Sequence, residues 1–122
     1  MIEMDEDLNP IFSALEIDLV EWVRSNPKTC KHVTGHNSRY MFIFNNKGGL
    51  TIDLNRFNED YYREVFSMYK YERNRKAFVH KACLIIRDTL IRIKKHHITL
   101  SITLKHWNTT ETNTFYIHPK VK

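Results

Sequence analysis

Glycine and proline are scarce in this sequence, with three of each among 122 residues. These residues are the usual markers of turns and loops, and together they make up about 12% of an average protein. Their scarcity favours a few long elements joined by short connections and excludes a proline-rich disordered chain. Hydrophobic residues at 42% and charged residues at 27% are typical of one globular domain. We therefore expect a single domain over residues 1–122, with a flexible acidic stretch at residues 1–8.

Cysteine and long hydrophobic runs are also rare. Cys30 and Cys83 are too few for a disulfide framework, so two reduced thiols are expected. The apolar runs are a few residues long, whereas a transmembrane helix needs about 18 or more. The acidic N-terminus lacks the positive charge and apolar core of a secretory signal. These absences predict an intracellular, cytoplasmic protein with no membrane partner.

The hydrophobic pattern predicts an α+β fold in the order helix, hairpin, helix or helix pair, hairpin. Residues 10–25 have helical spacing of apolar side chains between a cap at Asn9 and a break at Pro27. Two stretches rich in aromatic and β-branched residues, 40–44 and 50–54, surround an Asn/Gly turn and predict a hairpin. Residues 58–97 contain neither glycine nor proline and predict helix. We expect this helical region to be capped at Asn58 and to kink or break near Asn74.

The last quarter of the chain predicts the second hairpin. Apolar and polar residues alternate over 98–105, which is the pattern of a strand with one buried face. A polar turn at 108–113 leads to a return strand at 114–118. Between the hairpins, residues 78–93 carry an apolar arc wide enough to cover a sheet. We therefore expect four antiparallel strands covered on one face by the helices, as a two-layer sandwich.

The net charge of +5 hides an uneven distribution. Residues 1–30 contain seven acids and two bases, whereas residues 31–122 contain seven acids and 17 bases. In the dense basic stretch 70–95, Lys76, Arg87 and Lys94 lie along one line of a helix. That line suits the phosphates of a nucleic-acid backbone, and it is equally typical of a solvated helix face. The residues expected to contact nucleic acid are Arg73, Arg75, Lys76, Arg87, Arg92, Lys94, Lys95 and Lys105.

The polar face of the second hairpin is another candidate surface for nucleic acid. Strand alternation directs Lys105 and Trp107 outward, with Tyr116 and His118 beside them. Sheets that present aromatic rings beside cations stack unpaired bases. The ribonucleoprotein motif of such sheets is missing here, and Trp107 lies at a strand end from which it can also fold back over the core.

A protein-interaction module, such as a small inhibitor or immunity-type protein, is the alternative hypothesis. Its partner would be a protein or a nucleoprotein complex. Leu84 and Ile91 lie outside the core-facing arc and form a thin stripe. This stripe suits packing against the first helix, a partner protein or a second copy of the chain. The acidic residues of the first helix offer a further partner surface, formed by Glu16, Asp18 and Glu21.

A metal-independent ribonuclease is a third hypothesis, because two histidines beside a lysine can act as base and acid. His106, His118 and Lys105 are expected on neighbouring strands. Nothing close to them in the sequence orients them for that role. Without another catalytic pattern, a non-catalytic binding protein remains the expectation.

Metal ligation has only a partial pattern. Cys30, His32 and His36 have the short spacing of metal ligands, and Cys83 with His80 would have to complete the site. This second pair does not have a recognised zinc spacing. We therefore expect neither a metal nor a cofactor.

Overall fold

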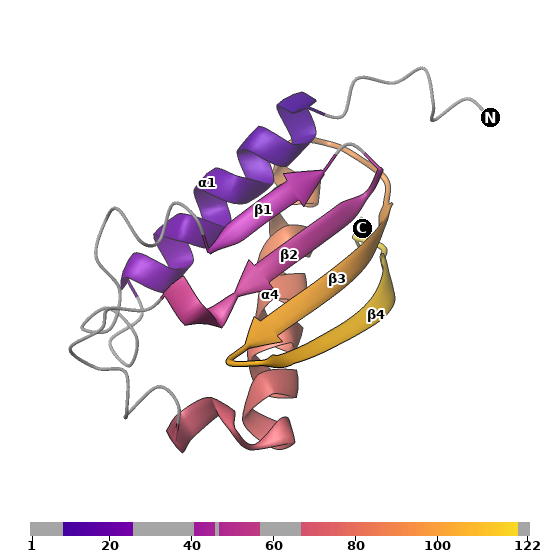
Figure 1. Ribbon diagram of the computed structural model, residues 1–122. Helices are drawn as coiled ribbons and strands as arrows, with labels where there is room; N and C mark the ends of the chain where they lie inside the picture. The colour runs from indigo at the N-terminus through magenta and orange to yellow at the C-terminus, as the bar shows by residue number, and fades with distance from the viewer. Residues whose placement is uncertain (1–8, 26–40, 46, 57–66, 120–122) are drawn as a thin grey trace.

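The computed structural model describes residues 9–25, 41–45, 47–56 and 67–119 (Figure 1). It begins with α1 (Asn9–Ser25), β1 (Phe42–Asn45) and β2 (Gly49–Asp53). A short 3-10 helix, η2 (Leu54–Arg56), follows β2, and α4 (Glu72–Arg92) leads to β3 (Ile98–His106) and β4 (Thr109–Ile117). The predicted α+β fold and its order of helix, hairpin, helix and hairpin are confirmed.

The four strands form one sheet in the order β1-β2-β3-β4, but the sheet is mixed, so the prediction of four antiparallel strands is wrong. Each hairpin is antiparallel, whereas the central strands β2 and β3 run parallel, with Leu50 opposite Ile102. The hairpin patterns define pairing only within each hairpin. The helix between them sets their mutual direction, because α4 returns the chain to the end of the sheet at which β2 began.

Both helices pack against one face of the sheet; in Figure 1, α4 lies behind the strands and α1 is seen beside β1. The hydrophobic core lies between the helices and this face, and each strand directs every second side chain into it, as predicted for residues 98–105. The apolar arc of α4 covers the sheet through Phe78, Ala82, Ile86 and Leu90, which are all buried. The opposite face carries no helix among the described residues, and we call it the open face.

The helical region is interrupted at Lys70 and Tyr71, close to the break expected near Asn74. Residues 67–69 form a helical turn, Lys70 and Tyr71 lie between the two helical segments, and α4 starts at Glu72 instead of near Asn74. The side-chain amide of Asn74 donates to the carbonyl of Met68 at 2.6 Å, which ties the two segments together. The expected cap at Asn58 and the acidic residues 1–8 lie outside the described residues.

Asp18 of α1 joins the two helices. Its carboxylate accepts hydrogen bonds from the Thr89 hydroxyl at 2.6 Å and from Arg92 Nη2 at 2.7 Å. Thr89 is only 2% exposed, so its hydroxyl depends on a partner inside the protein. Partial burial raises the pKa of Asp18, but the hydrogen bonds from Thr89 and Arg92 outweigh it and hold that pKa below its usual value of 3.8.

Replacing Asp18 by asparagine is expected to lower the free energy of unfolding by about 1 kcal/mol at neutral pH. The effect is modest because Arg92 is largely exposed and water screens its charge. The folded-state pKa is lowered, so the carboxylate stabilises the fold above its unfolded-state value of 3.8, and this contribution is lost as the pH falls through the folded-state pKa. Urea unfolding of both proteins at neutral pH and at about pH 2 tests this. The difference should close at acid pH, and a constant difference would contradict the role of the charge.

Candidate nucleic-acid interface

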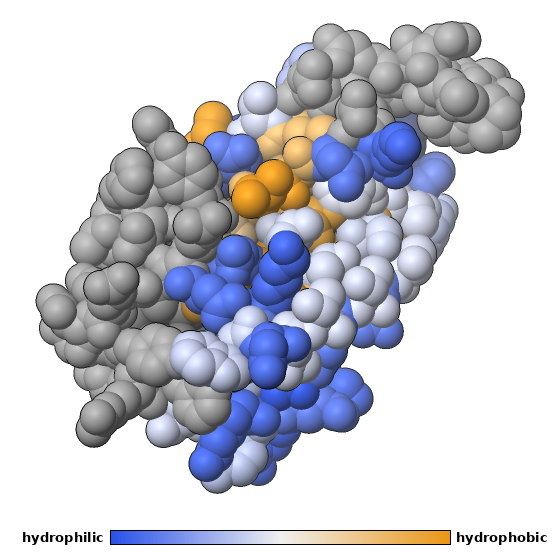
Figure 2. Space-filling view, viewed as in Figure 1, coloured by the Kyte–Doolittle hydropathy of each residue, from blue (hydrophilic) through white to orange (hydrophobic). Residues whose placement is uncertain are grey.

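The open face is polar over β3 and β4. The register of β3 with β4 places Ser101 beside Thr114 and Thr103 beside Thr112, and the side-chain hydroxyls of Thr103 and Thr112 lie 3.0 Å apart. Figure 2 looks onto this face and shows hydrophilic residues over β3 and β4, with hydrophobic residues mainly towards β1. Hydroxyls both donate and accept hydrogen bonds, so they suit phosphates, sugars and base edges alike. The open face consists of Ile43, Thr51, Asp53, Thr99, Ser101, Thr103, Lys105, Thr110, Thr112, Thr114 and Tyr116.

Three rings gather where β3 begins and β4 ends. The Tyr116 ring lies 5.1 Å from that of His97 and 6.2 Å from that of His118, centroid to centroid. The Tyr116 and His118 rings are nearly parallel, with 9° between their planes. Tyr116 is 62% exposed, so its ring does not serve the core. Together these residues form an exposed aromatic surface at one end of the open face.

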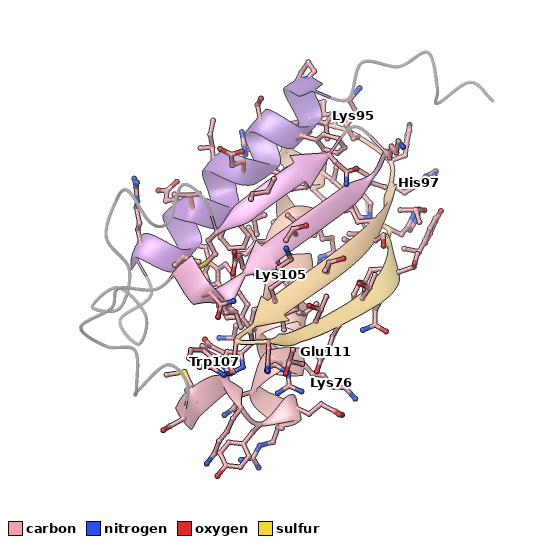
Figure 3. The ribbon with its side chains drawn as sticks, in the orientation of Figure 1. Lys76, Lys95, His97, Lys105, Trp107 and Glu111 are labelled. Atoms are coloured by element: carbon pink, nitrogen blue, oxygen red, sulfur yellow. The ribbon has the colours of Figure 1, made fainter. Side chains whose placement is uncertain are left out.

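Three segments distant in sequence bring lysine or histidine side chains to the same end. The β1–β2 turn contains Lys47 and contacts the start of β3, because the Gly48 carbonyl accepts the Ser101 N–H at 3.0 Å. Residues 94–97 connect α4 to β3, and His118 follows β4. In Figure 3, Lys95 and His97 lie at this end of the sheet, and Trp107 lies at the other. The basic end consists of the exposed residues Lys47, Lys94, Lys95, His96, His97 and His118.

The backbone of Lys94 has a left-handed conformation, with φ of 60°. Its N–H donates to the Ile91 carbonyl at 3.1 Å, and the Lys95 N–H donates to the Leu90 carbonyl at 2.9 Å. This is the Schellman pattern that closes helices, and glycine is its usual residue at the left-handed position. A β-carbon there costs about 1 kcal/mol. Lys94 therefore places a charge where stability alone favours glycine.

Trp107 has the same unusual conformation at the other end of the sheet. It begins the two-residue β3–β4 turn with φ of 60° and is 54% exposed, so its ring does not fold back over the core. Asn55 of η2 holds its backbone from both sides, since its Oδ1 accepts the Trp107 N–H at 2.7 Å and its Nδ2 donates to the Trp107 carbonyl at 3.2 Å. Bulky residues with positive φ persist only where their surroundings impose it, and they concentrate at functional sites.

The predicted phosphate-binding residues do not share one surface. Arg73, Lys76 and Arg87 lie along α4, on the helical side of the sheet, and none of the three belongs to the buried core. Lys94 and Lys95 belong to the basic end, whereas Lys105 lies on the open face (Figure 3). Since the sheet separates α4 from the open face, one strand of nucleic acid cannot contact both along a straight path.

Arg75 and Arg92 are occupied by acids of the same chain. Arg92 binds Asp18, so the acidic first helix does mask part of the basic region. Arg75 donates to Glu111 through Nε at 2.9 Å and again through Nη2, and its Nη1 donates to the carbonyls of residues 69 and 70. Both side chains connect elements of the fold, so neither is counted in the candidate interface.

The Leu84 and Ile91 stripe is not part of the packing between α1 and the rest of the protein. Ile91 is 40% exposed and Leu84 is half-buried, and within the described part of the chain neither belongs to the core cluster or packs against it. On α1, Glu21 is exposed and Glu16 is half-buried, while Asp18 is bound to α4. The acidic face remains a candidate surface, because a hollow of about 510 Å³ beside α1 is lined by Glu16 and Glu21 as well as Arg24. Neither this mixed charge nor the stripe identifies a partner.

The histidines of the ribonuclease hypothesis lie at opposite ends of the second hairpin. His106 pairs with Thr109, whereas His118 follows Ile117, which pairs with Ile98. Eight residues of strand separate these ends, or about 26 Å. His106 is also buried, and burial together with the nearby charge of Arg75 lowers its pKa against the opposing influence of Glu111. One phosphodiester therefore cannot contact both histidines.

The remaining candidate ligands do not form a described metal site. Cys30, His32 and His36 lie outside the described residues, while Cys83 and His80 line a groove between α4 and β4. Within the described part of the chain, no three His, Cys, Asp or Glu side chains cluster as metal ligands. Neither described helix has the length and apolar character of a membrane span.

Comparison of the chain with protein-family models, curated proteins and solved structures gives no match. The candidate interface therefore depends on geometry alone. Sequence reasoning missed Lys47 and His97 because an antiparallel β2–β3 pair would place their turns at opposite ends of the sheet. The parallel pairing is what brings both turns to the basic end.

Proposed function

We propose that the protein binds single-stranded nucleic acid on the open face, with the phosphates at the basic end. The observation that supports this most directly is the meeting of exposed cations and exposed rings where β3 begins and β4 ends. Single-stranded nucleic acid needs both features, because cations attract its backbone and rings stack on its bases. Duplex DNA hides its base faces and would use only the cations.

Each part of this surface has a distinct task. Lys94 and Lys95 draw phosphates to the basic end and add affinity without reading sequence. The Tyr116 ring, which lies beside those of His97 and His118, stacks on a base, an interaction worth about 1–3 kcal/mol. The hydroxyls of β3 and β4 continue over about 20 Å towards Trp107, which provides a second ring.

Charge reversal at the basic end tests this proposal. Lys94→Glu with Lys95→Glu is expected to weaken binding of a fluorescent oligothymidine or oligouridine at least tenfold at low salt. The slope of log affinity against log salt should fall by about 0.7 for each phosphate that the variant no longer neutralises. Tyr116→Ala should weaken binding about tenfold and leave that slope unchanged. Fluorescence anisotropy over a salt series measures both quantities.

The matched control is Arg73→Glu with Lys81→Glu, which makes the same change in net charge on α4. This variant should keep most of the affinity, because both of its positions are exposed on α4, away from the open face. Equal losses in the two double variants would mean that general charge, and not the basic end, attracts the oligonucleotide. No binding by the unmodified protein at low salt would disprove the proposal.

A further inference from the structure

A groove separates α4 from the edge strand β4 on the helical side of the sheet. It encloses about 450 Å³, and its apolar walls include Val79, Cys83 and Phe115. Burial raises the pKa of the Cys83 thiol to about 11, so the thiol is neutral at physiological pH. The groove is therefore suited to apolar side chains, and Thr114 is the one described lining residue that it shares with the open face.

The outer edge of β4 adjoins this groove, and no described strand pairs with its outward backbone groups. Its nine residues pair with β3 on one side, and no other described strand lies on the other side. In a hairpin with a two-residue turn, the two residues that flank the turn form backbone hydrogen bonds with each other. From there, every second residue of β4 is hydrogen-bonded to β3 and the residues between them direct their N–H and C=O away from β3. The residues whose N–H and C=O point outward are thus Thr110, Thr112, Thr114 and Tyr116.

This edge has few of the features that normally prevent strand addition: its single charged residue, Glu111, is bound to Arg75. Within β4 there is no proline, lysine or arginine, and its register with β3 is continuous, without a bulge. Long, regular edges of this kind are templates for another strand. Threonine and aromatic residues, which dominate β4, favour extended structure on both strands of such a pair.

The charge along the groove indicates the kind of strand that fits. Lys76 and His80 border the groove. Successive residues of a helix are rotated by about 100°, so Arg87 lies on the same face of α4 as Lys76 and His80. The acid on the β4 side, Glu111, is already neutralised by Arg75. Lys76 binds Glu72, and Arg87 Nη2 lies 3.7 Å from Asp88 Oδ1. All four side chains are at least 39% exposed, so an incoming carboxylate can replace such pairs at little cost.

We propose that an extended acidic segment of a partner protein adds to β4 as a fifth strand. Its backbone pairs with the outward groups of β4, and its inward side chains enter the groove, apolar ones against Cys83 and acidic ones towards Lys76 and Arg87. Nucleic acid does not offer the alternating donors and acceptors that a strand edge needs. A second copy of this chain, paired through β4, would bring the basic residues along the two grooves close to each other, and their charges would repel.

A synthetic peptide with blocked ends, Thr-Glu-Thr-Leu-Thr-Glu-Thr, is the probe. In an added strand its glutamates and leucine share the inward side. NMR titration should shift the amide signals of Thr110, Thr112 and Thr114 and slow their hydrogen exchange. The same peptide with lysine in place of glutamate should bind at least tenfold more weakly, and one N-methylated at alternate positions should not bind. Equal binding of the lysine or N-methylated peptide would overturn the proposal.

Matched variants of the protein separate backbone pairing from side-chain effects. Thr114→Pro removes an outward N–H and should abolish peptide binding, whereas Thr114→Val keeps the N–H and the shape of the side chain and should retain it. Lys76→Glu with Arg87→Glu should weaken binding at least tenfold. Retained binding in Thr114→Pro would contradict strand addition, and the N-methylated peptide tests the same point without altering the protein.

Two further measurements distinguish this proposal from the alternatives. Lys94→Glu with Lys95→Glu should keep peptide affinity within about twofold while losing oligonucleotide affinity. The peptide proposal and the nucleic-acid proposal can therefore be disproved separately. Sedimentation of the unmodified protein over a range of concentrations should show no dimer that depends on the β4 edge. A dimer of that kind would be present in the unmodified protein and absent in Thr114→Pro. Such a dimer would identify a second copy as the occupant of the edge and overturn the proposal.

Discussion

Replacing Arg75 by alanine is expected to lower the free energy of unfolding by about 2–3 kcal/mol. The side chain of Arg75 is only 11% exposed, and its guanidinium binds Glu111 of β4 and the carbonyls of Tyr69 and Lys70. Alanine leaves a half-buried carboxylate and two carbonyls without this donor, and the desolvation of unpaired groups is costly. Urea unfolding followed by circular dichroism measures the change.

The neighbouring residue gives the control for this prediction. Lys76→Ala removes the same charge from a pair that is largely exposed, so it should leave the free energy of unfolding nearly unchanged. Loss of Arg75 should also raise the pKa of His106, because the charge of Arg75 helps to lower it and Glu111 opposes that effect. Equal destabilisation by the two variants, with no upward shift of the His106 titration in NMR, would show that the hydrogen bonds of Arg75 contribute little.

Replacing Trp107 by glycine is expected to give a more stable protein than replacing it by alanine, by about 1 kcal/mol. Glycine normally stabilises a folded chain less than alanine does, because it loses more freedom on folding. At φ of 60° the order is reversed, since alanine keeps a β-carbon that crowds the left-handed conformation. Both variants lack the ring, so the comparison isolates the strain of the backbone. Thermal and urea unfolding of the pair test the reversed order.

Oligonucleotide affinity provides the second readout for these variants. Both should bind oligothymidine about tenfold more weakly than the unmodified protein, because stacking on one ring is worth about 1–3 kcal/mol. A glycine variant that gained stability and kept full affinity would show that the strained tryptophan serves something other than nucleic acid. An alanine variant as stable as the glycine variant would show that Asn55 imposes no strain on the turn.

Most elements of the fold were predictable from local patterns, but their arrangement was not. One boundary was also wrong, because β4 begins at Thr109, within the stretch 108–113 that was expected to form a turn. Alternation over residues 98–105 and the apolar arc of residues 78–93 depend on neighbours a few positions away, and both predictions are confirmed. The direction of β3 relative to β2 depends on the path of α4 through space. No residue near Leu50 or Ile102 encodes their parallel pairing, because it arises only when the helix packs across the sheet.

The candidate interface was predictable only in part for the same reason. Lys94 and Lys95 follow a basic helix and were expected to bind phosphate, which remains a proposal. Arg92 binds Asp18, which is 74 positions away in the sequence. Counting charges along the sequence therefore cannot show that Arg92 already has an acidic partner. Lys47 carries no local signal, since only the topology brings its turn to the basic end.

The parallel pairing at the centre of the sheet also has a consequence for folding kinetics. Each hairpin closes a short loop and forms quickly, whereas β2 and β3 meet only after the long segment containing α4 has been ordered. Closing such a loop costs entropy before any favourable interaction offsets it, so pairing of the two hairpins sets the folding rate. Substitutions that strengthen α4 should therefore accelerate folding more than equally stabilising changes in either hairpin turn.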